Sequence, residues 1–148
     1  MTTGSEPEII FFIDRCLGKR LIPEAFQSSG IAVEIHDDHF SEDAIDVDWL
    51  PEIGKRGWVV LTKDAKISKN HLERMAVTNA GISMFILASQ NLSGKKMADI
   101  FLGAVTKMQE FVRKHPAPFI AKVYRDGRVE MWKDAQTLLD ELREITSQ

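Results

Sequence analysis

The sequence has a single cysteine, Cys16, among 148 residues. One cysteine excludes a disulfide framework within the chain and a zinc site built from several thiolates. No apolar run approaches the roughly 20 residues that a membrane-spanning helix needs. Residues 1–8 are polar and acidic, unlike a secretory signal peptide. We therefore expect a cytoplasmic protein that does not associate with membranes.

Basic residues are not in excess, because 19 Lys and Arg stand against 22 Asp and Glu, for a formal net charge of −3. This balance argues against a protein that coats nucleic acid through bulk positive charge. The acids are unevenly distributed: residues 34–48 contain seven of them and no Lys or Arg, which leaves the rest of the chain net positive. The acidic segment indicates a divalent-cation site or a solvated loop, and for most of the seven we expect a solvated loop.

Short apolar runs alternate with helix-length segments through the first part of the chain. Four runs predict buried strands: 8–13, 31–36, 58–61 and 84–87. Three segments between them have helical spacing: 20–28, 49–55 and 69–79. Helix-length connections between fully apolar strands indicate a parallel sheet with helices on both faces. We therefore predict an α/β fold with three α/β/α layers and a mostly parallel sheet.

The second part of the chain has a different pattern. Ser93 is placed to cap a long helix that runs to about Lys114 with an unbroken apolar stripe. Asp126-Gly127 between β-prone runs predicts a β-hairpin, and a last helix should begin at Lys133 or Asp134. We expect one domain over 1–148, with the acidic site in 8–90 and the long helix, hairpin and terminal helix in 91–148.

Two aspartates follow apolar strands at their carboxyl ends, where ligands bind in parallel sheets. Asp14 directly follows the first strand, and Asp64 lies three residues after the third. If these strands are neighbours, both carboxylates point into one crevice, and Asp46 or Asp48 can supply a third. Converging carboxylates repel one another unless a divalent cation lies between them. Oxygen ligands favour Mg²⁺ or Mn²⁺, and a water on such a cation can attack a phosphodiester.

Three segments together have the order and spacing of a known superfamily. They are Phe-Phe-Ile-Asp14-Arg-Cys-Leu-Gly, Asp46-Val-Asp48-Trp-Leu-Pro and Arg-Gly-Trp-Val-Val-Leu-Thr62-Lys-Asp64. Over roughly residues 9–87 the chain resembles the PIN-like nuclease superfamily. It is most similar to the compact branch that includes toxin ribonucleases of VapBC-type toxin–antitoxin systems.

The resemblance assigns roles to particular residues. Asp14 matches the first metal-binding acid, and Asp64 matches the acid after the third strand, with Thr62 as its polar companion. Asp46 lies 18 residues before Asp64, as in the compact branch, and we rank it narrowly above Asp48 as the middle acid. Within a helix those two would diverge by about 200°. Larger PIN nucleases often have a fourth acid, which we do not assign, although the helix after Asp64 offers Glu73.

The resemblance also implies a function. It implies a metal-dependent endoribonuclease in which Asp14, Asp46 and Asp64 bind Mg²⁺ or Mn²⁺ and water attacks RNA. A toxin is the expected setting, with RNA as substrate, a cognate antitoxin as protein partner and a homodimer as an open alternative to the monomer. Four cations flank the key acids and are candidates to bind the RNA backbone: Arg15, Lys63, Lys66 and Lys69.

Other functions compete with this hypothesis. A PIN-like fold with a depleted site would serve as a protein-binding or regulatory module, which the unassigned fourth acid slightly favours. A receiver-like phosphoacceptor domain is much less favoured, because Asp14 has no acidic neighbour and Lys122 lies in the predicted hairpin. Cys16 has no visible His partner for nucleophilic catalysis, and His36 and His39 lack a third metal ligand at a defined spacing.

Overall fold

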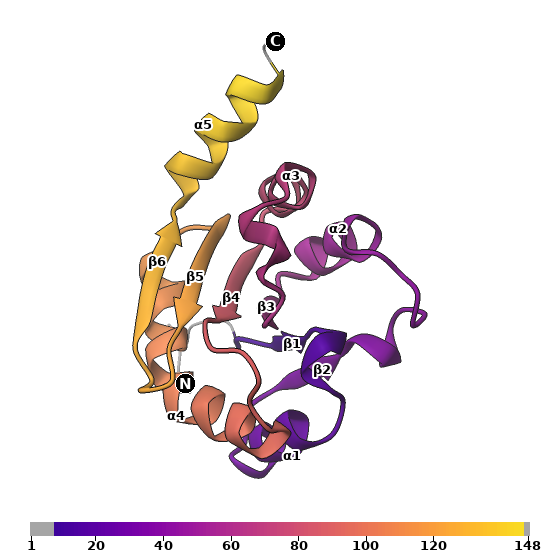
Figure 1. Ribbon diagram of the computed structural model, residues 1–148, viewed down its shortest axis with the longest axis vertical. Coiled ribbons are helices and arrows are strands. Elements are labelled where there is room, and N and C mark those ends of the chain that lie inside the picture. Colours follow the sequence, from indigo (N-terminus) through magenta and orange to yellow (C-terminus); the bar gives the residue numbers. More distant parts are fainter. Residues whose placement is uncertain (1–7, 147–148) are drawn as a thin grey trace, which may run out of the picture.

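The computed structural model describes residues 8–146, apart from the side chains of Asp46, Val47 and Ser68. Its centre is a six-stranded sheet in the order β2-β1-β3-β4-β5-β6, parallel throughout except for the antiparallel edge strand β6 (Figure 1). The strands are β1 (Phe11–Ile13), β2 (Val33–Ile35), β3 (Val59–Thr62), β4 (Ser83–Leu87), β5 (Phe119–Val123) and β6 (Val129–Lys133).

Among the described residues, four α-helices and three short 3₁₀ helices connect the strands, and a fifth α-helix follows β6. The α-helices are α1 (Leu21–Ser28), α2 (Asp46–Arg56), α3 (His71–Ala80), α4 (Gly94–Lys114) and α5 (Ala135–Thr146). The 3₁₀ helices are η1 (Arg15–Leu17), η2 (His36–Asp38) and η3 (Ala65–Ser68). The predicted α/β fold with a mostly parallel sheet, a C-terminal hairpin and a terminal helix is confirmed. Within the described residues, no helix has the length and apolar character needed to cross a membrane.

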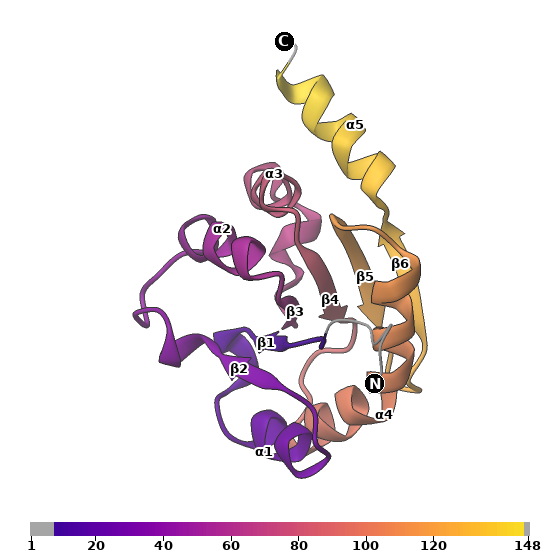
Figure 2. The same ribbon diagram turned by 180° about the vertical axis from the view of Figure 1, so that it is seen from behind.

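The sheet separates two hydrophobic layers. Phe11 and Leu61 face the layer that contains α1 and α4, whereas Phe12 and Val60 face the layer that contains α2 and α3. Figure 2 shows the same pairs of helices gathered on opposite sides of the strands. Because both faces are covered, the central strands need apolar side chains at most positions, and this explains the apolar runs in the sequence. Thr62 in β3 and Ser83 in β4 are buried polar exceptions.

The ends of several elements differ from the sequence prediction. The first strand is Phe11–Ile13 rather than 8–13, because residues 8–10 lie at the margin of the sheet and are only partly covered or exposed. The helix predicted over 49–55 begins at Asp46, three residues earlier than its first apolar position. Helix caps were predicted better than strand ends: the Ser93 hydroxyl accepts the Lys96 N–H at 3.1 Å.

The terminal helix α5 extends away from the sheet (Figure 1). Leu138 is its buried side chain, at 1 % exposure. Glu141 of α5 accepts a hydrogen bond from Arg74 Nε at 3.1 Å and also pairs with Lys133 at the end of β6. The terminal helix is thus attached to α3 and the edge strand by one leucine and a small ionic cluster.

Candidate active site

The carboxyl ends of β1 and β3 meet at one edge of the sheet. The two strands are parallel neighbours with Ile13 beside Leu61 in register. The backbone N–H of Asp14 donates to the Leu61 carbonyl at 3.0 Å, so the pairing continues one residue beyond β1. This places Asp14 beside Thr62, at the edge where parallel sheets bind ligands.

Thr62 connects the two aspartates that the sequence singled out. Its Oγ1 donates to Asp14 Oδ2 at 2.7 Å and accepts the backbone N–H of Asp64 at 3.1 Å. A hydroxyl has one proton and two lone pairs, so it can make both bonds at once. Thr62 is 2 % exposed and Asp14 is 8 % exposed, so this linkage is well shielded from water. The structure therefore brings Asp14, Thr62 and Asp64 together.

Asp64 opens the 3₁₀ helix η3 that follows β3. Its Oδ1 accepts the backbone N–H of Lys66 at 2.9 Å, which is the usual way an Asp side chain closes a short turn. This bond occupies one carboxylate oxygen and fixes the side chain at the strand end. Asp64 is only partly covered, so its carboxylate remains accessible from the solvent side of the edge.

A further carboxylate, Glu73 on α3, interacts electrostatically with the same two aspartates. Partial burial raises the pKa of Glu73, as do the negative charges of Asp64 and, more weakly, Asp14, while the charge of Lys66 opposes the shift. These charges place Glu73 within electrostatic range of both aspartates. Its Oε2 is buried and has no hydrogen-bond partner among the described residues. An unsatisfied buried oxygen costs on the order of 1–3 kcal/mol, so this arrangement favours a bound cation or proton.

The spacing of Asn70 and Glu73 in the sequence fits a helix cap as well as a site residue. Asn70 caps α3, and its Oδ1 accepts the N–H groups of Leu72 and Glu73 at 2.9 and 3.3 Å. An N-cap residue followed three positions later by Glu is a capping box, in which the Glu side chain bonds back to the cap. The orphaned Oε2 of Glu73 shows that this carboxylate is not fully used by the cap. Sequence reasoning named this residue without assigning it.

The middle acid of the predicted set belongs to α2. Asp46 is the first residue of that helix, after Ile45 at the N-cap position, but its side chain lies outside the described residues. Asp48 is two residues further on and exposed. We call the strand ends that carry Asp14 and Asp64 the acidic edge. Residues two apart on a helix point about 200° apart, so only one of this pair can face the acidic edge. Asp46 as the middle ligand stays a prediction.

The donor set at this edge suits a hard divalent cation. Among the described side chains, no three His, Cys, Asp or Glu form a group with metal-binding geometry. The described carboxylates near the edge are Asp14, Asp64 and Glu73, and Asp46 would add a fourth. Carboxylate oxygens of this kind favour Mg²⁺ or Mn²⁺ over softer metals. The unsatisfied oxygen of Glu73 is the observation that fits such an ion.

Cys16 lies beside this edge but lacks the properties of a nucleophile. Its Sγ lies 3.5 Å from Asp14 Oδ2 and 3.3 Å from Thr62 Oγ1. Burial of the sulfur and, after it, the negative charge of Asp14 raise the pKa of Cys16 to about 11. The thiolate, not the thiol, attacks electrophiles and binds metals. At neutral pH Cys16 is therefore a thiol that packs against the two side chains.

The two histidines of the acidic segment have structural partners. His36 is buried, and its ring lies 5.6 Å from Phe40 and 5.8 Å from Trp49, measured between ring centroids. His39 Nε2 lies 2.8 Å from Glu34 Oε1. These contacts stabilise the loop after β2, so the two rings do not form a shared metal site.

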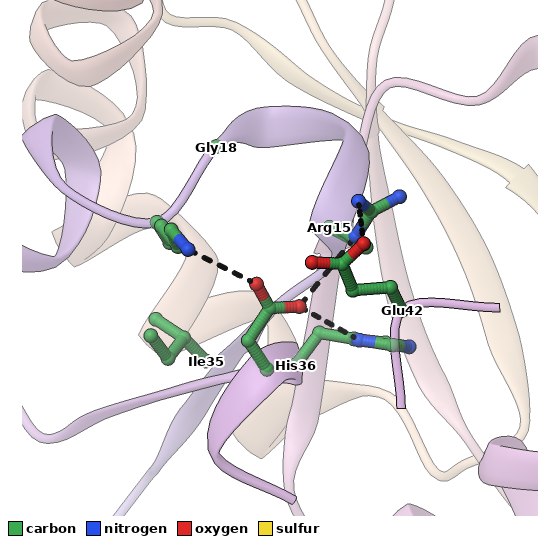
Figure 3. Close-up of a pocket in the computed structure, with 7 residues that line it drawn as sticks. Arg15, Gly18, Ile35, His36 and Glu42 are labelled. Atoms are coloured by element: carbon green, nitrogen blue, oxygen red, sulfur yellow. Dashed lines mark hydrogen bonds and ion pairs between the residues drawn. The ribbon is translucent and has the colours of Figure 1, made fainter. Parts of the chain in front are cut away.

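On the β1–β2 side of the acidic edge, the cations are already paired. Arg15 Nε lies 3.6 Å from Asp37 Oδ1, and Arg15 Nη2 lies 3.4 Å from Glu42 Oε2. Lys19 Nζ lies 3.6 Å from the other oxygen of Asp37. These four residues line an open cavity of about 310 Å³ with His36 at its side (Figure 3). We call this cavity the paired side.

On the η3–α3 side, the two lysines form no ion pair with a described carboxylate, although the charge of Lys66 acts on Glu73. Lys66, Lys69 and His71 line an open cavity of about 440 Å³ together with Asn70 and Leu72. Within the part of the chain that the structure describes, no carboxylate forms an ion pair with either lysine. We call this cavity the open side. The remaining candidate cation, Lys63, is half-buried at the end of β3, and its carbonyl accepts Gln90 Nε2 at 3.2 Å.

Comparisons with known proteins agree with this geometry. The family model described as "PIN like domain" matches residues 9–89, more than half of the chain. The chain is 26 % identical over 117 residues to the protein named "Putative ribonuclease VapC45" from Mycobacterium tuberculosis (strain ATCC 25618 / H37Rv), across 76 % of this chain and 84 % of that protein. No solved structure matches the chain significantly. The predicted resemblance is confirmed, and the chain belongs to the PIN-like domain family.

Proposed function

We propose that the chain is a metal-dependent endoribonuclease of PIN type and the toxin of a toxin–antitoxin pair. The observation that carries the proposal is the linkage of Asp14 and Asp64 through Thr62 at the carboxyl ends of β1 and β3. The orphaned oxygen of Glu73, whose pKa both aspartates raise, supports it. Membership of the PIN-like family and similarity to a protein named as a ribonuclease support RNA as the substrate.

Asp14, Asp46 and Asp64 would hold Mg²⁺ or Mn²⁺, with Glu73 beside them. Such an ion polarises the phosphodiester and lowers the pKa of a bound water. Thr62 acts by positioning, because its hydroxyl proton fixes Asp14 Oδ2 and its lone pair fixes the Asp64 backbone. Glu73 Oε2 receives no hydrogen bond from the described residues, so it can accept a proton from attacking water.

The RNA and protein partners belong to the same proposal. Lys63, Lys66 and Lys69 would bind the RNA backbone near the acids, and Arg15 would do so only by exchanging a carboxylate partner for a phosphate. A cognate antitoxin would bind the toxin in the cytoplasm, and a homodimer is compatible with both roles. A PIN-like binding module is the second candidate, favoured by the lack of a three-ligand metal group among the described side chains.

Cleavage of structured RNA by the purified chain tests the proposal. We expect cleavage with Mg²⁺ or Mn²⁺, none with EDTA, and a loss of more than roughly 100-fold in Asp14→Asn, since even residues behind metal ligands contribute 10- to 100-fold. Asp99→Asn is the matched control, because Asp99 is an exposed carboxylate on α4, on the far layer of the sheet. No cleavage with any divalent metal would leave the binding module as the better account.

A further inference from the structure

We propose that single-stranded RNA crosses the acidic edge toward the open side, where Lys66, Lys69 and His71 bind its backbone and Leu72 contacts a base. This inference rests on the proposed function and adds the path of the substrate. It assigns the cavity between η3 and the first turn of α3 as the binding site for the nucleotides next to the cleaved bond. It also predicts that the paired side binds little RNA.

The composition of the open side fits a nucleic-acid strand. Lys66 and Lys69 are exposed, and no described carboxylate pairs with them. A polyanion therefore meets these lysines without displacing an ion-pair partner, although the nearby Glu73 charge offsets part of the attraction of Lys66. Attraction of this kind is the main source of backbone affinity. The cavity of about 440 Å³ lies within the range of pockets that hold small ligands, so it is large enough for part of a nucleotide chain.

His71 presents a hydrogen-bond donor to this cavity. Arg74 Nη2 lies 2.8 Å from His71 Nδ1. Arginine has donors only, so Nδ1 of the ring must be the acceptor. The ring proton is then on Nε2, which is the nitrogen left to donate to a phosphate or base oxygen. Arg74 itself is buried and also donates to the Ile67 carbonyl at 2.9 Å, so the ring rests on a fixed support.

Leu72 adds an apolar contact among the cations. It is 68 % exposed on the first turn of α3 and lines the same cavity. A single exposed leucine is common on protein surfaces. What matters here is that it lines the same cavity as His71 and the lysines, so a base next to the cleaved phosphate would meet an apolar side chain there. Apolar and π-face contacts to bases tolerate any sequence.

The open side also continues directly from the acids. Lys66 follows Asp64 by two residues and donates its backbone N–H to that carboxylate. Glu73 follows Leu72 on the same turn of α3. The RNA strand would therefore stay in contact with the protein as it passes from the acids to the lysines. On the paired side, a phosphate must first displace Asp37 or Glu42 from Arg15.

Binding of a fluorescent single-stranded RNA in EDTA, where no metal-dependent cleavage interferes, tests the path. The test variant is Lys66→Ala/Lys69→Ala, and the matched control Arg15→Ala/Lys19→Ala removes the same charge from the paired side. We expect the test variant to bind roughly tenfold more weakly and to lower the slope of log affinity against log salt by about 1.4, at about 0.7 per lost phosphate contact. The control should change affinity by less than about twofold. Leu72→Ser tests the apolar contact at constant charge and should weaken binding at high salt.

Each outcome decides between the accounts. Equal losses in the two double variants, or a larger loss in the control, would overturn the open-side path while leaving RNA binding and cleavage in place. If the test variant keeps its RNA affinity but loses affinity for a polyglutamate peptide, the cavity binds acidic protein and the path is wrong. Failure of the wild-type chain both to bind and to cleave RNA would overturn the proposed function and this inference with it. All four lysine and arginine side chains are substantially exposed, so these variants should keep the wild-type melting temperature.

Discussion

Both sides of the acidic edge carry cations, but only those of the paired side form ion pairs with described carboxylates. On the paired side, Arg15 and Lys19 are bound to Asp37 and Glu42. On the open side, Lys66 and its neighbours have no described carboxylate partner. A count of basic residues near the acids does not separate the two sides, because both hold lysines next to a strand-end aspartate. We expect the pairing of each cation to decide which side attracts a polyanion.

Apart from the acids themselves, the largest expected effect concerns Thr62, which lies between the two sides. Thr62→Val keeps the shape of the side chain but removes both the donor to Asp14 and the acceptor for the Asp64 N–H. We expect kcat for RNA cleavage to fall roughly 10- to 100-fold, the cost of losing a residue that orients metal ligands. Thr62→Ser keeps the hydroxyl and should retain most activity. Equal activity in both variants would mean that the hydroxyl does not position the aspartates.

The next largest effect is expected from the ionic cluster of Arg74, Glu141 and Lys133, which supports the open side. Glu141→Gln removes the carboxylate that Arg74 and Lys133 share, and Arg74 holds both Ile67 and His71. Because Glu141 is partly exposed, we expect a loss of about 1–2 kcal/mol in stability, below the cost of breaking a fully buried pair. Amide hydrogen exchange should accelerate over residues 65–72 and stay unchanged over residues 33–39. Uniform acceleration over both segments would break the proposed separation of the two sides.

A smaller effect is expected from Glu73 in the metal-free protein. The folded state raises the pKa of Glu73 above its ordinary value of 4.5, through burial and the nearby Asp64 and Asp14 charges. The ionised side chain therefore destabilises the fold at neutral pH, and this cost disappears as the pH falls below that ordinary value. Glu73→Gln should raise the melting temperature in EDTA at pH 7 by roughly 1–3 °C, and by nothing near pH 4.

Added metal should reverse the order of thermal stability between the wild-type chain and Glu73→Gln. With Mn²⁺ added, the wild-type chain should gain more thermal stability than Glu73→Gln, because ligand binding stabilises only the folded state that can bind it. A variant that melts lower than wild type in EDTA would show that Glu73 is a helix-capping residue and not part of the acid set.

The smallest prediction partly opens the paired side, because Glu42 still pairs with Arg15. Asp37→Asn removes the carboxylate that holds both Arg15 and Lys19. Exposed ion pairs are worth up to about 1 kcal/mol, so we expect RNA affinity to rise by at most about fivefold, with a steeper salt dependence. Weaker RNA binding by this variant would indicate that Asp37 orients Arg15 for RNA rather than competing with it.

The sequence predicted the sheet, the order of its elements and the position of two aspartates at strand ends for a simple physical reason. Strands buried on both faces must be apolar throughout, and Asp14 and Asp64 end two such runs. The state of Arg15 was not predictable, because its partners Asp37 and Glu42 come from the loop after β2, whose path depends on the packing of His36 and Phe40. Local spacing contains no information about that packing.

The environment of Glu73 is a second feature that local spacing in the sequence did not predict. Its position three residues after Asn70 predicts a capping box, and nothing in the spacing indicates that the charge of Asp64 raises the pKa of this carboxyl. That effect depends on how α3 packs against the sheet. The attachment of α5 through Glu141 is likewise a tertiary contact between residues that are distant in sequence.

Calorimetric titration of Mn²⁺ into the purified chain tests the central claim most directly. The account predicts one site that is lost in Asp14→Asn and Asp46→Asn, weakened in Glu73→Gln, and retained in Asp48→Asn and in Asp37→Asn on the paired side. Mn²⁺ binding that survives Asp14→Asn, or a wild-type chain that binds no divalent metal, would contradict a metal centre at the carboxyl ends of β1 and β3.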